Sequence, residues 1–198
     1  VRFSLTTGLV DQLTGAYSFA VWNLDAANPA NINAVLTSDV DDAVAVGDVV
    51  DTISNLITVA AQGQVDVTSR PVGDNTVNNV TFPLEDQEMS IDFGMVGDEF
   101  MVGLGDGIDT ITTPPTETLA DTQAFTDAVG LLPTEYQAIY YVNIHAIQEA
   151  SNAASGESTS VFGMEVGSDA TTAAESLAAV TWVEGGNTYT SAVLVVPE

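Results

Sequence analysis

The sequence predicts an α+β fold in which an antiparallel sheet carries helices packed on one face. Some segments place apolar residues at spacings of three and four, as a helix requires, whereas others alternate apolar and polar residues, as a strand requires. Short turns rich in Gly, Asp and Pro separate the alternating segments, which is typical of antiparallel hairpins. A chain of 198 residues is long enough to bury a core of this kind.

The first third of the chain predicts two helices and two strands. Residues 5–15 indicate a short helix, and residues 16–24 and 32–38 alternate as strands. The acidic stretch SDVDD supplies side chains that cap a helix, and the apolar positions after it recur on one face. We therefore expect the longest helix at 40–61.

Residues 64–105 change to a period of two and predict four short strands separated by Gly-Asp or Pro turns. The tightest of these turns is expected at 96–99, because Gly and Asp tolerate a positive φ.

The last third predicts three helices, a strand and a hairpin. Helices are expected at 119–133, 145–154 and 171–179, and a buried strand at 137–144. A closing hairpin should turn at Glu184-Gly185-Gly186-Asn187.

We expect one domain over 1–198, with a division into subunits 1–63 and 64–198 as the alternative. Segments 5–61 and 119–196 share a loose order of helix and strands, which also indicates a duplicated unit as a hypothesis. Because the chain begins with Val, we expect it to be the C-terminal part of a longer precursor, with any anchor upstream.

The charge of the chain restricts its partners. Asp and Glu number 28 against two basic residues, Arg2 and Arg70, for a net charge of −26. Nucleic acid and anionic membrane surfaces are poor partners for such a chain. A cationic surface, a protein partner or like subunits remain, and a subunit should bury its least acidic face, expected near 178–196. An acidic surface also suits high salt, so halophilic adaptation is a competing interpretation.

The absence of cysteine excludes disulfides and thiolate chemistry. No run reaches the roughly 18 uninterrupted apolar residues of a membrane helix, so we expect no membrane span in this segment. The composition is typical of an exported protein and predicts an extracytoplasmic location.

The stretch GLGDGID, residues 103–109, poses the main question of chemistry. Its glycines do not follow the order of a phosphate-binding loop, and the chain has no lysine to assist one. Asp106 and Asp109 offer the oxygens that calcium prefers, but the EF-hand spacing is absent. We interpret the stretch as the end of a strand.

Other acidic groups have simple explanations. Asp39, Asp41 and Asp42 fit a helix start better than a cation site. The pairs Glu85-Asp86 and Asp98-Glu99 fall in predicted turns, and carboxylate pairs will occur by chance among so many acids.

His145 is the sole histidine and fits a structural role, since Gly156-Glu157-Ser158 does not complete a nucleophile elbow. Four aromatic residues fit a core or sheet face better than a sugar platform: Trp22, Trp182, Tyr17 and Tyr189. The sequon at Asn79 is too short a motif to carry weight.

Three segments resemble one known family: GLVDQLTGAYSFAVW, GDEFMVGLGDGIDTI and LADTQAFTDAVGLLPTEYQAIYYVNI. The order of a Leu-x-Gly turn, an aromatic strand, a Leu-Ala-Asp helix and a tyrosine-bearing strand resembles the exported bacterial family called domain of unknown function 3352. The resemblance covers most of 5–196. It implies an extracytoplasmic location and a longer N-terminal portion, and it brings no catalytic residues. The near absence of Lys and Arg departs from the family.

The expected function is therefore a non-enzymatic extracytoplasmic structural or interaction module, a subunit or accessory part of a surface or membrane-associated assembly. No catalytic, cofactor-binding or metal-binding residue is assigned. Two alternatives stay open: an acid-type hydrolase of a polysaccharide or similar polymer acting through a carboxylate pair, and a calcium-dependent surface or adhesion module.

Overall fold

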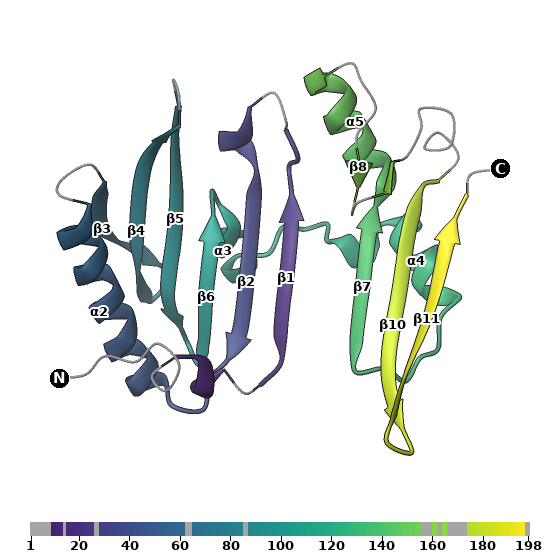
Figure 1. Ribbon diagram of the computed structural model, residues 1–198, viewed down its shortest axis with the longest axis horizontal. Helices are drawn as coiled ribbons and strands as arrows, with labels where there is room; N and C mark the ends of the chain where they lie inside the picture. The colour runs from purple at the N-terminus through teal and green to yellow at the C-terminus, as the bar shows by residue number, and fades with distance from the viewer. Residues whose placement is uncertain are drawn as a thin grey trace. The chain divides into compact units, whose positions relative to one another are not determined.

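The computed structural model confirms a mixed α+β protein whose paired strands are antiparallel (Figure 1). The structure describes residues 9–13, 15–25, 28–61, 65–84, 87–155, 160–161, 164–165 and 174–196. The chain forms two compact units: unit 1 is Val1–Asn23 with Asn28–Pro114, and unit 2 is Leu24–Ala27 with Pro115–Glu198. The alternative division at residue 63 does not coincide with these units, because strands on both sides of that position share one sheet.

Unit 1 is built on a six-stranded sheet in the order β1-β2-β6-β5-β4-β3. Its strands are β1 (Tyr17–Trp22), β2 (Asn33–Asp39), β3 (Asp66–Val72), β4 (Asn75–Leu84), β5 (Gln87–Val96) and β6 (Glu99–Leu104). The hairpin expected at 96–99 is confirmed, and Gly97 at its tip has a φ of +61°. Short 3-10 turns, η1 (Val10–Gln12) and η2 (Pro29–Asn31), precede β1 and β2.

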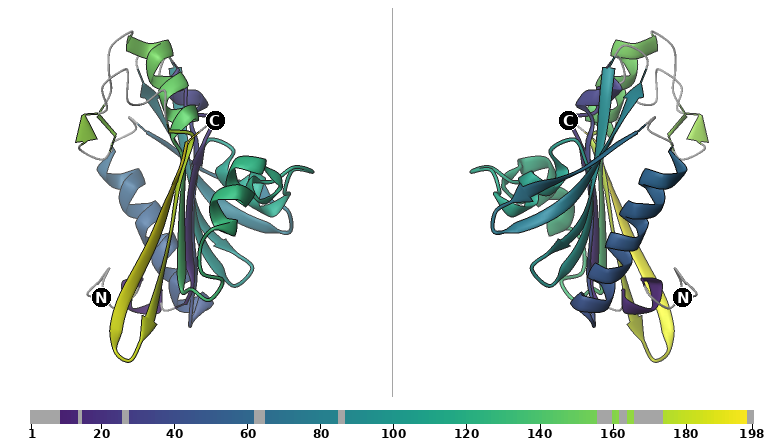
Figure 2. Two further views of the ribbon diagram at one scale, coloured as in Figure 1. Left: turned by 90° about the vertical axis from the view of Figure 1, so that its right-hand side faces the viewer. Right: turned by 90° about the vertical axis from the view of Figure 1, so that its left-hand side faces the viewer.

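The long helix of unit 1, α2 (Ala43–Ala60), begins where the acidic stretch predicted. Asp42 Oδ1 accepts hydrogen bonds from the backbone N–H groups of Val44 (3.1 Å) and Ala45 (3.0 Å), which caps the helix. The helix packs on one face of the sheet (Figure 2, α2 in blue). The buried cluster between them consists of Val46, Val50, Val80, Phe93 and Phe100.

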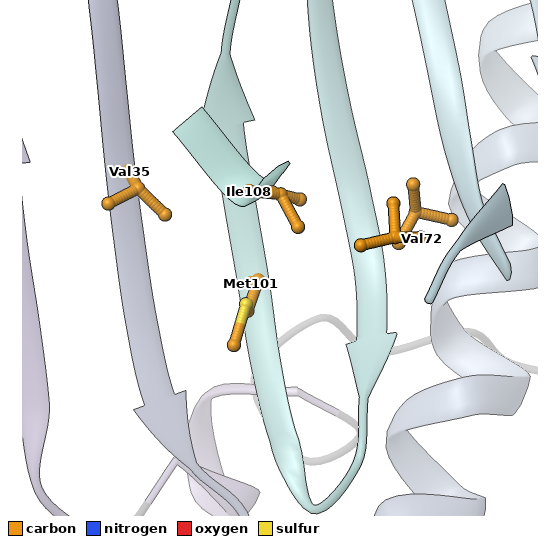
Figure 3. Packing of buried hydrophobic residues seen from close by; sticks show 5 residues of the cluster. Val35, Val72, Met101 and Ile108 are labelled. Carbon is orange, nitrogen blue, oxygen red and sulfur yellow. The ribbon is translucent and has the colours of Figure 1, made fainter. Parts of the chain in front are cut away.

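A second helix, α3 (Gly107–Thr112), packs on the opposite face of the same sheet. Its Ile108 is buried with Val35, Val72, Val77 and Met101 (Figure 3, in which all of these except Val77 are labelled). Because Met101 adjoins Phe100 in β6, the two clusters lie on opposite faces. The expectation of helices on one face is therefore not met in unit 1.

Glycine allows α3 to approach the sheet closely. A Cβ on Gly107 would collide with the backbone carbonyl oxygen of Ala34 in β2. A Cβ on Gly103 would lie 2.7 Å from Ile108 Cγ1. Both positions therefore require glycine for packing.

Unit 2 is built on a three-stranded sheet in the order β11-β10-β7. The strands are β7 (Ala138–Asn143), β10 (Ser176–Glu184) and β11 (Asn187–Val195), and the helical elements are η3 (Leu119–Asp121), α4 (Gln123–Gly130) and α5 (Ile144–Ser155). α4 packs on one face of the sheet, around Ala128, Leu132, Ala178 and Val180. A separate short pair joins β8 (Ser160–Val161) to β9 (Met164–Glu165).

Three expectations for the last third need correction or restriction. The helix expected at 171–179 is wrong where the structure describes it, because β10 begins at Ser176. The strand expected at 137–144 exists, but it is not buried, since Tyr140 is 53% exposed. The helix expected at 119–133 divides into η3 and α4. The duplicated unit is not evident in the described residues, because the elements of 5–61 run η1-β1-η2-β2-α2 whereas those of 119–196 run η3-α4-β7-α5-β8-β9-β10-β11.

Among the described residues, one helix, α2, is long and apolar enough by length and composition to cross a membrane. Here it packs on the sheet with three valines buried, Val46, Val49 and Val50. One face of α2 thus packs on the sheet, and 17% of the helix is buried.

Candidate functional site

The most elaborate polar group in the described part of the chain surrounds Arg70 of β3, on the α3 face of unit 1. Its guanidinium lies between two carboxylates, Asp92 of β5 and Asp109 of α3. Arg70 Nε donates to Asp92 Oδ2 at 3.0 Å, and Nη1 donates to Asp109 Oδ1 at 3.1 Å. Nη2 contacts both carboxylates, lying 2.6 Å from Asp109 Oδ2 and in closer contact with Asp92 Oδ2. We call these three residues the Arg70 cluster.

Strand register brings the sheet members of this cluster together. Arg70 pairs with Val77, and Asn79 pairs with Asp92, so all four side chains point to the same face. Asn79 Nδ2 donates to Asp92 Oδ1 at 2.7 Å, while Thr81 Oγ1 donates to Asn79 Oδ1 at 3.0 Å. Asn79 and Thr81 of the sequon thus belong to a polar network that glycosylation of Asn79 would disrupt.

Burial differs strongly across the Arg70 cluster. The side chain of Asp92 is 2% exposed, that of Arg70 27% and that of Asp109 48%. The hydrogen bonds to Asp92 and then to Asp109 raise the pKa of Arg70 above its ordinary value, so it stays charged at every accessible pH. The guanidinium of Arg70 therefore neutralises the charge of the buried Asp92 and, by binding Asp109, links α3 to the sheet.

The contacts of the Arg70 cluster are those of an ion pair that joins elements of unit 1. Both carboxylates accept hydrogen bonds from the same guanidinium, whereas acid–base hydrolysis needs one carboxyl group that can donate a proton. Among the described residues, the side chains of the Arg70 cluster form no hydrogen bond with a serine or histidine. The described residues also contain no group of three or more His, Asp and Glu side chains placed to hold a metal ion.

The stretch 103–109 ends a strand as predicted, since β6 ends at Leu104. The whole stretch was interpreted as a strand end, but its last residues begin a helix, because α3 starts at Gly107. Asp109, one of the two candidate calcium ligands, binds Arg70. Asp106 precedes α3, and its backbone N–H donates to Asn33 Oδ1 at 3.1 Å.

The other acidic cluster is a helix start, as predicted. Asp42 caps α2, and Asp39 Oδ2 accepts a hydrogen bond from Ala16 N at 3.2 Å. The backbone N–H of Asp41 donates to the carbonyl oxygen of Gln12. The three residues thus have separate structural partners.

His145 lies in the first turn of α5 and is exposed. Its Nε2 is 3.4 Å from Glu149 Oε1, one helical turn further on. Its backbone N–H donates to the carbonyl oxygen of Glu175. Both contacts are of the structural kind that the sequence indicated.

The aromatic residues occupy cores and sheet faces. Trp22 packs against the buried cluster of α3, and Trp182 packs against the core of unit 2. Trp182 and Tyr189 are cross-strand partners with ring centroids 5.5 Å apart. Tyr17 lies on a sheet face and is 72% exposed.

Asp98 and Glu99 lie at the β5–β6 turn, as expected, and the other two motifs singled out, Glu85-Asp86 and Gly156-Glu157-Ser158, lie outside the described residues. Sequence reasoning missed the Arg70 cluster. One signal was available, since Arg70 and Asp92 are charged residues of opposite sign inside two segments that the sequence predicts as strands.

A second feature is the face of the unit 2 sheet opposite α4. The register places eleven side chains there: Ala138, Tyr140, Val142, Leu177, Ala179, Thr181, Val183, Thr188, Thr190, Ala192 and Leu194. We call this surface the open face. None of these residues is Asp, Glu, Lys or Arg, and three large ones are about half exposed: Tyr140 (53%), Val183 (50%) and Leu194 (54%).

The family model described as Protein of unknown function (DUF3352) matches residues 1–182. This match confirms the resemblance drawn from the three sequence segments. Neither a curated protein nor a solved structure matches the chain.

Proposed function

We propose that this chain, which belongs to the DUF3352 family of proteins of unknown function, acts through its surfaces and not through catalysis. In this proposal it is a non-enzymatic extracytoplasmic structural or interaction module. It serves as a subunit or accessory part of a surface or membrane-associated assembly and binds a protein partner through the open face of unit 2.

The observation that carries this proposal is the open face itself. The side of an antiparallel sheet that faces solvent ordinarily carries charged or strongly polar residues. This one is made of Ala, Val, Leu, Thr and Tyr in a chain with 28 acidic residues. It also fits the expectation that a subunit buries its least acidic face near 178–196.

Binding there is favourable because no carboxylate has to lose its water. Complete burial of a Val or Leu side chain contributes about 1.5–3 kcal/mol. Tyr140, Val183 and Leu194 are already about half buried, so their remaining exposed parts offer roughly 1 kcal/mol each. The hydroxyl groups of Thr181, Thr188 and Thr190 can hydrogen-bond a partner without adding charge.

Composition supports the location in this proposal. The chain carries no cysteine, and its net charge of −26 keeps an exported protein soluble and away from anionic surfaces. The described polar groups support the non-enzymatic role, because the Arg70 cluster is explained by its contacts within unit 1.

The experiment compares the size of the native complex formed by three variants of the full chain, each expressed in its source cells. Leu194→Glu and Val183→Glu place a carboxylate on the open face, and Val44→Glu places the same charge on α2, where Val44 is 76% exposed. All three positions are at least half exposed, so circular dichroism should show native folds.

The proposal expects the open-face variants to leave the complex and migrate as the free chain on a native gel. The Val44→Glu chain should stay in the complex. A Leu194→Glu chain that remains in a complex of unchanged size would overturn the role of the open face.

A further inference from the structure

The two outer strands of the unit 1 sheet differ in how they are protected. β3 contains Asp66, Arg70 and Pro71, and both inward charges and proline discourage another strand from pairing with an edge. β1, at the other edge, reads YSFAVW and contains no charge, proline or glycine. Natural sheets seldom leave such an edge without a partner.

β1 also presents an apolar row. Tyr17, Phe19 and Val21 alternate onto one face and are 72%, 69% and 42% exposed. Leu36 of β2 pairs with Phe19 and is 39% exposed. We call these four residues the β1 row. Within the described sheets β1 pairs only with β2, so its second side can accept a strand.

We infer that the occupant of this edge is a second copy of the chain, which adds its own β1 antiparallel to the first. A two-fold axis through Phe19 and perpendicular to the sheet places Phe19 of one copy opposite Phe19 of the other. Tyr17 of each copy then lies opposite Val21 of its partner. Aromatic–aromatic and aromatic–β-branched pairs are favourable across strands, and the axis keeps both rows on one face.

Charge favours a second copy over a basic partner at this edge. A cationic protein gains nothing from a strand that has no carboxylate. Two copies with a charge of −26 repel one another over most of their surfaces, and an uncharged strand is where they can approach. Along the chain, the carboxylates that flank β1 are Asp11 and Asp25, and Asp39 of β2 lies one residue beyond the position paired with Tyr17.

This pairing uses unit 1 and does not depend on the open face of unit 2, so each proposal can fail alone. The test is analytical ultracentrifugation of the full chain over a series of concentrations, at low and at high sodium chloride. We expect a monomer–dimer equilibrium whose Kd falls by about tenfold or more with added salt, because salt screens the repulsion between the copies.

Two matched variants locate the interface. Phe19→Glu places two carboxylates opposite one another in the dimer and should raise the Kd by about tenfold or more. Val44→Glu makes the same charge change at a comparably exposed position and should leave the Kd close to that of the wild type.

Because the chain has no cysteine, a single introduced thiol gives a second readout. Opposed residues of an antiparallel pair have Cα atoms about 4.5–5.5 Å apart, within reach of a disulfide. Phe19→Cys should therefore form a covalent dimer under mild oxidation much faster than Val44→Cys. A wild-type chain that stays monomeric at every salt concentration would overturn the inference, as would equal cross-linking rates for the two thiols.

Discussion

Removal of the charge at Arg70 tests whether the Arg70 cluster holds unit 1 together. Arg70→Met keeps most of the aliphatic length of the side chain but leaves Asp92 as an unpaired carboxylate at 2% side-chain exposure. Loss of one partner from a buried ion pair typically costs about 3–5 kcal/mol. Arg70 is 27% exposed, so water offsets part of the loss and we expect about 3 kcal/mol.

Two further variants separate the contributions within the cluster. Asp109→Asn removes a carboxylate that is 48% exposed, and we expect a loss of only about 0.5–1 kcal/mol. The double variant Arg70→Met/Asp92→Asn removes both members of the buried pair and keeps an amide oxygen that can accept the hydrogen bond from Asn79. It should recover most of the stability lost in Arg70→Met.

The assay is urea unfolding followed by tryptophan fluorescence in a Trp182→Phe background. The chain has two tryptophans, and this background leaves only Trp22, which packs against the buried cluster of α3 in unit 1. High salt should reduce the effect of Asp109→Asn but not that of Arg70→Met. The role of the Arg70 cluster in stabilising unit 1 would be contradicted if Arg70→Met lowered the free energy of unfolding no more than Asp109→Asn does, and if adding Asp92→Asn to Arg70→Met recovered no stability.

Three smaller predictions concern local structure. Asp42→Ala should destabilise unit 1 by about 1 kcal/mol in the same urea assay because α2 loses its cap, whereas Asp42→Asn should lose much less. Gly107→Ala should lower the free energy of unfolding of unit 1 by more than about 2 kcal/mol, because the added Cβ collides with β2. Gly47→Ala should raise it by about 0.5–1 kcal/mol, because Gly47 lies inside α2 with open space around it. Hydrogen bonds from the backbone N–H and then from the hydroxyl of Thr118 lower the pKa of Asp121 below its ordinary value of 3.8, so this carboxylate stabilises η3 above pH 3.8 and the stabilisation is lost as the pH falls through the lower folded pKa. In Thr118→Val, the pKa of Asp121 measured by NMR titration should move toward 3.8. An unchanged pKa would contradict the role of the hydroxyl.

Elements with strong local signals could be predicted from the sequence. The start of α2 followed from acidic residues in front of an apolar repeat, and the cap by Asp42 confirms that reasoning. The β5–β6 turn followed from Gly97 and Asp98 between two alternating segments. In both cases the determining residues lie within a few positions of one another.

Elements that depend on distant residues were missed. α3 has six residues, too few for a clear apolar period, and it forms where Ile108 enters the core and Asp109 meets Arg70, 39 positions earlier in the chain. The Ala-rich start of β10 suggested a helix, but pairing with both β7 and β11 makes it the central strand. β7 was expected to be buried because it is apolar. It is instead an outer strand of the sheet, and alternate side chains of β7 belong to the open face.

The most direct test of the proposed function is the accessibility of the open face in intact source cells. Single thiols at Val183→Cys and Val44→Cys, each in the otherwise cysteine-free chain, would be labelled with a membrane-impermeant maleimide, and labelling of the purified chain would give the reference rates. We predict that both thiols react in the purified chain and that only Val44→Cys reacts in cells, because a partner covers the open face outside the cytoplasm. Equal labelling of both thiols in cells would contradict the binding role, and labelling of neither before lysis would contradict the extracytoplasmic location.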